Sequence, residues 1–146
     1  MPKTQPKSAR KPRILITAQD MEILESMVGR YATRNAAINL LEDELARAVL
    51  VNEDFNTRPF CRIGSRVTYE DLSSGQIRDI QLVLPSDADI DQQRVSVLSL
   101  VGASLLGLVA DAEFGWTDDN GRPHKLRVLK VEDQKKVEDE QYAQLE

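Results

Sequence analysis

The sequence predicts an α+β fold, in which two amphipathic helices precede an antiparallel sheet that carries one short helix. Apolar residues recur at helical spacing over residues 18–28 and 36–51. Beyond residue 63 the period changes to the alternation of half-buried strands. Turns rich in Gly, Asp and Ser separate these strands, as expected for hairpins. The 146 residues can form one ordinary domain or two small domains that pack together.

The first helix is predicted over residues 18–28, after the short apolar segment 14–16. Thr17 is the predicted N-cap, and Asp20 takes the place of the Glu preferred in a capping box. Gly29 is expected to end the helix in the left-handed conformation. The apolar face consists of Met21, Leu24, Met27 and Val28.

The second helix is predicted over residues 36–51, with Asn35 as its N-cap. The short connection between the helices predicts an antiparallel hairpin, with Arg30, Tyr31 and Arg34 exposed at its tip. So short a pair must rest on the remainder of the chain to be stable. The predicted contacts are Met21, Leu24, Val28, Ile38, Leu41 and Leu45.

The remaining chain divides into a linker, a sheet domain over residues 64–132 and a charged tail. Residues 52–63 form the linker, because they mix polar residues with an Arg-Pro pair that disfavours helix. A helical segment is predicted over residues 101–107. The predicted strands are 66–70, 77–84, 95–97, 113–117 and 125–131, and the charged tail is 133–146.

The charge is unevenly distributed. Residues 1–13 carry five Lys and Arg and no acid, so the other residues hold 14 bases against 24 acids, a net charge of 14 − 24 = −10. This sign excludes a broad basic face for nucleic acid. The segment 1–13 is either a disordered, solubilising extension or a contact for phosphates or an acidic protein.

The composition also limits the compartment and the covalent chemistry. The single cysteine, Cys61, excludes an internal disulfide and any cysteine-based zinc cluster. No apolar run is long enough for a membrane span, and no signal peptide is recognisable. These observations predict a cytoplasmic protein without a membrane partner.

The sequence offers no catalytic constellation. The alternating acids Asp87, Asp89 and Asp91 lack the Gly and Glu that complete a calcium loop. The spacing of Gly102 and Gly107 matches a phosphate loop, but Leu follows where Lys is required. His124 is the only histidine and has no evident partner. We therefore expect no enzyme activity, no metal and no cofactor.

The C-terminal half resembles a known protein family. The stretch QRVSVLSLVGASLLGL at residues 93–108, then Asp111 and the hairpin to Leu129–Glu132, resembles the C-terminal domain of the Gre-type transcript-cleavage factors. The match looks closer still to the short-armed relatives called regulators of nucleoside diphosphate kinase (Rnk). The resemblance covers about residues 14–132. It implies an FKBP-like twisted antiparallel sheet with a short helix.

The resemblance also implies a function. Gre-type factors bind bacterial RNA polymerase at the rim of the secondary channel, and their helical arm enters the channel. Acidic residues at the arm tip help to hold the catalytic magnesium, whereas residues 29–35 of this chain contain no acid. The resemblance therefore implies a monomeric, non-catalytic regulator that binds polymerase without stimulating cleavage. It would affect DNA only indirectly.

The family's docking segment corresponds here to Leu98, Ser99, Leu100 and Val101. Most relatives have Pro where Leu100 stands, and an exposed Leu would still suit an apolar anchor. Alternatively, Leu100 and Val101 simply cover the core. Two other functions remain open: an adaptor that affects nucleoside diphosphate kinase or nucleotide metabolism, and a peptidyl-prolyl isomerase-like enzyme suggested by fold alone.

Overall fold

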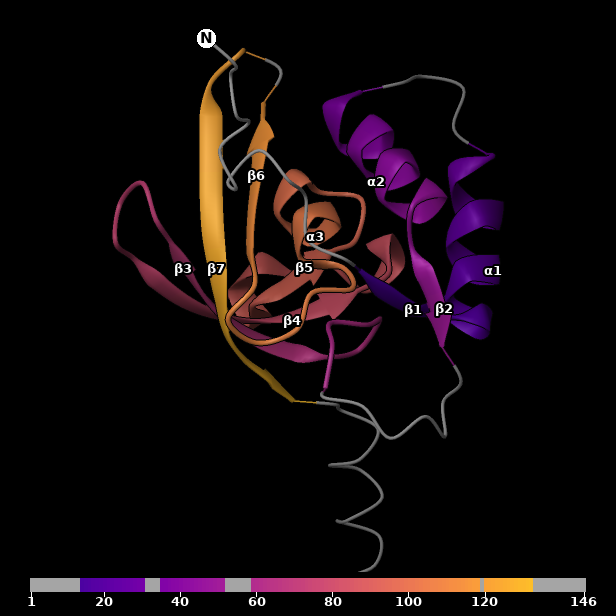
Figure 1. Cartoon of the computed structure of the whole chain (residues 1–146), viewed down its shortest axis with the longest axis horizontal. Coiled ribbons are helices and arrows are strands. Elements are labelled where there is room, and N and C mark those ends of the chain that lie inside the picture. The colour runs from indigo at the N-terminus through magenta and orange to yellow at the C-terminus, as the bar shows by residue number, and fades with distance from the viewer. Residues whose placement is uncertain (1–13, 31–34, 52–58, 119, 133–146) are drawn as a thin grey trace, which may run out of the picture.

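A computed structural model of the chain describes residues 14–30, 35–51, 59–118 and 120–132 (Figure 1). The two predicted tails and most of the predicted linker lie outside these residues. Within the described part, no helix is both long and apolar enough to cross a membrane.

The C-terminal part is a curled five-stranded sheet with the strand order β5-β4-β3-β7-β6 (Figure 1). Most neighbours are antiparallel, but β4 and β5 pair in parallel. This differs from the predicted all-antiparallel sheet, because the connection between β4 and β5 contains two short 3-10 turns that return the chain before β5 begins. The strands are β3 (Arg66–Asp71), β4 (Ile77–Val83), β5 (Arg94–Ser96), β6 (Glu113–Thr117) and β7 (Pro123–Glu132).

The short helix α3 (Leu100–Leu105) begins one residue before its predicted start and ends two residues before its predicted end. Ser99 is its N-cap, and the Ser99 hydroxyl accepts a hydrogen bond from the Gly102 N–H at 3.0 Å. The chain leaves the helix at Gly107, where φ is +83°. A Cβ at this position would lie 2.6 Å from that of Ile14, so the close approach of residues 14–15 requires glycine.

The helix α1 (Ala18–Val28) has its predicted bounds, and the Thr17 hydroxyl accepts from the Asp20 N–H at 3.1 Å. The prediction for Gly29 is wrong, since its φ is −64°. Its N–H donates to the Glu25 carbonyl at 3.1 Å, so the right-handed turn continues through this residue.

The helix α2 (Ala36–Ala46) is five residues shorter than predicted, although its predicted N-cap Asn35 is confirmed. The segment assigned to its last turn instead forms β2 (Val49–Val51), which pairs in parallel with β1 (Leu15–Thr17). Two β-branched valines suit a strand. The Val49 N–H also donates to the Ile14 carbonyl at 2.9 Å, a long-range bond that helical periodicity does not reveal.

A single buried cluster connects the N-terminal helices with the sheet. It includes Leu24 from α1, Leu41 from α2, Leu105 from α3, and Val67 and Leu126 from the sheet. The helices α2 and α3 pack against each other, and α1 lies on the far side of α2 (Figure 1). The N-terminal helices therefore rest on the C-terminal part and bury their apolar faces there.

Candidate functional site

A cavity of about 430 Å³ lies between the start of α3 and strands β3, β4, β6 and β7. A pocket of this size that combines apolar walls with a few polar groups is the default candidate for a binding site. The residues that line it come from five elements, so only the folded chain assembles the cavity.

The apolar wall of the cavity contains two of the four predicted docking residues. Leu100 and Val101 reach it from the first turn of α3, and Leu126 reaches it from β7. Leu98 and Ser99 do not line the cavity. Besides capping α3, the Ser99 hydroxyl donates to the Ser96 carbonyl at 2.7 Å, which fixes the loop that presents Leu100.

Aromatic side chains form a second wall. Trp116 and His124 are register partners on β6 and β7, and their rings stack with centroids 5.2 Å apart and planes 14° apart. The Trp116 indole N–H is buried and has no hydrogen-bond partner within the described residues. Phe114, two residues earlier on β6, is buried in the core, whereas Trp116 is only partly buried.

His124 has a partner that the sequence did not reveal. Its Nε2 lies 2.8 Å from the Asp118 carboxylate, across the turn between β6 and β7. That carboxylate also accepts from the Asn120 and Arg122 N–H groups, both at 2.9 Å. The hydrogen bond with His124, followed by that with Arg122, lowers the pKa of Asp118. The sequence signal for this pair is the position of Asp118 in a predicted hairpin turn, six residues before His124.

Charged groups surround the mouth. The Asp71 carboxylate accepts from the Ser73 N–H at 2.9 Å, and the Arg78 guanidinium donates to the Gln76 side chain at 2.8 Å. Tyr69 also lines the cavity, and burial is the main cause of its raised pKa, which the charge of Arg78 partly offsets. In the described part of the chain, no group of three or more His, Cys, Asp or Glu could hold a metal ion.

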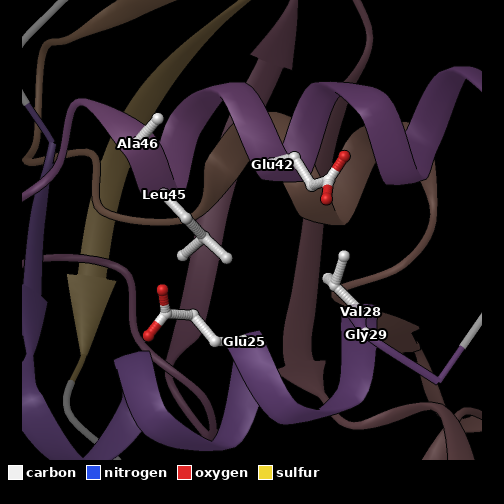
Figure 2. A pocket seen from close by; sticks show the side chains of 6 residues that line it. All are labelled: Glu25, Val28, Gly29, Glu42, Leu45 and Ala46. Carbon is white, nitrogen blue, oxygen red and sulfur yellow. The ribbon is translucent and has the colours of Figure 1, made fainter.

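A smaller cleft of about 260 Å³ separates α1 from α2 (Figure 2). Val28 and Leu45 point into it, and the carboxylates of Glu25 and Glu42 lie along its two helices (Figure 2). Of the predicted tip residues, Arg30 is exposed, whereas Tyr31 and Arg34 lie outside the described residues. The cleft is not evident from the sequence, because its residues belong to two different helices.

Cys61 belongs to the buried cluster and is unsuited to nucleophilic chemistry. Burial raises its pKa to about 12, partly offset by a hydrogen bond with the Leu108 backbone. The structure buries the Cys61 side chain completely.

Two family models match the chain. The model of the C-terminal domain of the transcription elongation factors GreA and GreB matches residues 57–133. The model of the Rnk N-terminus matches residues 12–51. The boundary between the matches falls in the predicted linker.

Individual proteins show the same similarity. The regulator of nucleoside diphosphate kinase of Escherichia coli K12 is 30% identical over 123 residues, which are 84% of this chain and 90% of that protein. The transcription inhibitor protein Gfh1 of Thermus aquaticus is 35% identical over 86 residues, which are 58% of this chain and 54% of Gfh1. The solved structure of a GreA/GreB elongation factor from Nitrosomonas europaea has a TM-score of 0.65 and 31% identity. The match covers 83% of this chain and 98% of that one.

Proposed function

This chain belongs to the GreA/GreB family of transcription elongation factors and has the N-terminus of the Rnk proteins, and we propose on this basis that it regulates transcription by binding bacterial RNA polymerase without stimulating transcript cleavage. The proposed binding place is the rim of the secondary channel. Similarity to a transcription inhibitor as well as to elongation factors is compatible with a non-catalytic regulator.

The observation that carries this proposal is the position of Leu100 and Val101. The Gre-type resemblance assigns polymerase docking to residues 98–101, and two of these, Leu100 and Val101, line the cavity. Both side chains are only partly buried, so they retain apolar surface for a partner. In this proposal the sheet with α3, residues 64–132, is an FKBP-like docking domain.

The proposed role of α1 and α2 is a short helical-hairpin arm, residues 14–51. Each helix has 11 residues, which gives a length of about 16 Å at 1.5 Å per residue. Residues 29–35 contain Arg30 and Arg34 but no carboxylate. A magnesium ion prefers carboxylate oxygens, and cations repel it, so we expect that the tip does not support metal-dependent cleavage.

Two assays on stalled elongation complexes test this function. A binding titration with core polymerase should saturate, and incubation with magnesium should not shorten the RNA beyond its level without the protein. A cleavage-competent Gre factor serves as the positive control. Added shortening of the RNA would refute the non-catalytic part, and the absence of saturable binding would refute the proposal as a whole.

The change Leu100→Gln tests the docking site. It removes an apolar contact while leaving the charge unchanged, and the loss of an interface hot spot costs about 2 kcal/mol, roughly 30-fold in Kd. We therefore expect polymerase binding to weaken by about this factor. Leu129→Gln is the matched control, because Leu129 is exposed on β7 and lies outside the cavity. Equal affinities for the two variants would remove Leu100 from the interface.

A second candidate function is an effect on nucleoside diphosphate kinase, favoured by the name of the E. coli relative. A direct effect would change the kinase rate in a mixture of the two purified proteins. An effect through transcription would leave that rate unchanged and alter only the amount of kinase in cells.

A further inference from the structure

We propose that the cavity beside α3 binds the side chain of an arginine in a basic segment of the partner protein. This deepens the proposed function by giving the chemistry that the C-terminal part recognises. It rests on that function only for the identity of the partner. Three features of the cavity support arginine: two carboxylates, an apolar wall and aromatic rings. The charge of the whole chain is a fourth argument.

The two carboxylates lie at the same end of the sheet. Asp71 is the last residue of β3, and Asp118 directly follows β6. Because β3 and β6 both pair antiparallel with β7, they end toward the same end of the sheet, and both carboxylates line the cavity. Asp71 is opposite Leu126 in this register, so its carboxylate stands beside the apolar wall. One oxygen of Asp71 accepts turn N–H groups, and its Oδ2 has no hydrogen-bond or ion-pair partner among the described residues.

The interior suits the remainder of an arginine side chain. Its three methylene groups can pack on Leu100, Val101 and Leu126 while the charged end stays near the mouth. A guanidinium also stacks on aromatic rings, which Tyr69 and Trp116 supply. Lysine has a more strongly hydrated, compact charge and lacks the planar donors that meet a carboxylate in pairs, so arginine fits better.

A guanidinium and an imidazole also line the cavity. Arg78 is the register partner of Tyr69 on β4 and donates to Gln76, on the side of the cavity away from β6. His124 is bonded to Asp118. Because Asp118 already has His124 as a partner, the Asp71 carboxylate is the acceptor that an incoming cation would meet.

The charge of the whole chain acts in the same direction. Residues 14–146 carry 14 bases and 24 acids, a net charge of 14 − 24 = −10. Such a charge attracts a basic partner segment from a distance and increases the association rate at low salt.

The single tryptophan makes the test direct, because Trp116 lines the cavity and is the only indole in the chain. The intact protein is titrated with three capped pentapeptides that have glycine around a central arginine, citrulline or leucine. Citrulline keeps the shape of arginine and removes its charge. We expect a saturable fluorescence change with the arginine peptide, at least tenfold weaker binding of the other two peptides, and further weakening as salt increases.

Variants locate the site. Asp71→Asn keeps an oxygen for the turn N–H groups and removes the charge, so the fold should persist while binding of the arginine peptide falls at least tenfold. Asp79→Asn is the matched control, because Asp79 is exposed on β4 and does not line the cavity. Equal loss in both variants, or equal binding of arginine and citrulline peptides, would overturn the proposal.

Other occupants give different results. Tighter binding of the leucine peptide would overturn the proposal in favour of an apolar anchor. Binding that appears only after removal of residues 1–13 would assign the cavity to the chain's own basic segment and would also overturn it. The peptide titration contains no polymerase. A failed titration with intact polymerase binding therefore rejects only the arginine site, and the reverse result rejects only the proposed function.

Discussion

At the scale of single residues, burial determines chemical behaviour more than residue type does. Cys61 is a potential nucleophile by composition, yet its thiol is fully buried and its pKa is raised to about 12. Trp116 and His124 are ordinary residues of a hairpin, yet their stacking makes them a wall of the cavity. A residue's neighbours across the sheet therefore decide its role.

Cys61 predicts a loss of stability at alkaline pH. Above its ordinary pKa of 9.0 the unfolded chain releases the thiol proton, whereas the folded chain keeps it until about pH 12. The unfolded state then binds fewer protons, so the free energy of unfolding falls as pH rises, by at most about 1.4 kcal/mol per pH unit for one group. Urea unfolding at pH 8, 9 and 10 measures this slope.

The control for that slope is Cys61→Ala. This variant is less stable at every pH because it leaves a small cavity, but it lacks the titrating thiol. Its stability should fall less steeply above pH 9 than that of the native chain. Parallel curves for the two proteins would assign the alkaline loss to other groups, of which Tyr69 is the first candidate because burial also raises its pKa.

At the scale of elements, side-chain caps fix where the helices begin. Thr17 and Asn35 were both predicted as N-caps, and both accept the expected backbone hydrogen bond. The ends of the N-terminal helices were predicted less well. The end of α2 depends on the pairing of β2 with β1, more than 30 residues earlier in the chain. Local sequence therefore specifies helix starts better than helix ends here.

The caps predict a difference in stability. Thr17 is only 1% exposed, so Thr17→Val leaves the Asp20 N–H without its acceptor in a buried place and should cost about 1–2 kcal/mol of unfolding free energy. Asn35 is exposed, so water can replace the lost acceptor in Asn35→Ala, and we expect a smaller loss of about 0.5–1 kcal/mol. Urea midpoints measure both.

Thr117→Val supplies the matched control, because it is the same substitution at an exposed position on β6. We expect its stability to stay within about 0.5 kcal/mol of the native value. If Thr17→Val behaved like this control, the cap would contribute nothing to the stability of α1.

At the scale of the whole molecule, the N-terminal helices and the sheet form one structural unit. Residues of α1, α2, α3 and the sheet belong to a single buried cluster. The Asp20 carboxylate of α1 also accepts from the Ile63 N–H at 3.3 Å, just before the sheet. Backbone bonds join Leu15 to Gly107 and Cys61 to Leu108. Neither part completes its core without the other.

This continuity predicts a single unfolding transition. Trp116 fluorescence reports on the sheet, whereas circular dichroism near 222 nm reports mainly on the helices. The two signals should change at the same urea concentration, because small domains with one core unfold cooperatively. A loss of helical signal at lower urea than the fluorescence change would show instead that α1 and α2 unfold separately.

The sequence by itself determined the elements whose evidence is local. It specified both helix caps, the bounds of α1 and β6, the approximate positions of the other strands, and the family resemblance carried by residues 93–108. Side-chain periodicity and capping depend on residues within a turn or two of each other, so these features can be read along the chain.

Only the tertiary structure decided the features that join distant residues. The pairing of β1 with β2, the parallel β4–β5 pair and the partnership of His124 with Asp118 required the folded backbone. The cavity likewise collects Tyr69, Leu100 and Trp116 from separate elements. The physical reason is that periodicity reports which face of an element is buried but carries no information on which other element covers it. Register and packing supply that information, and with it the site.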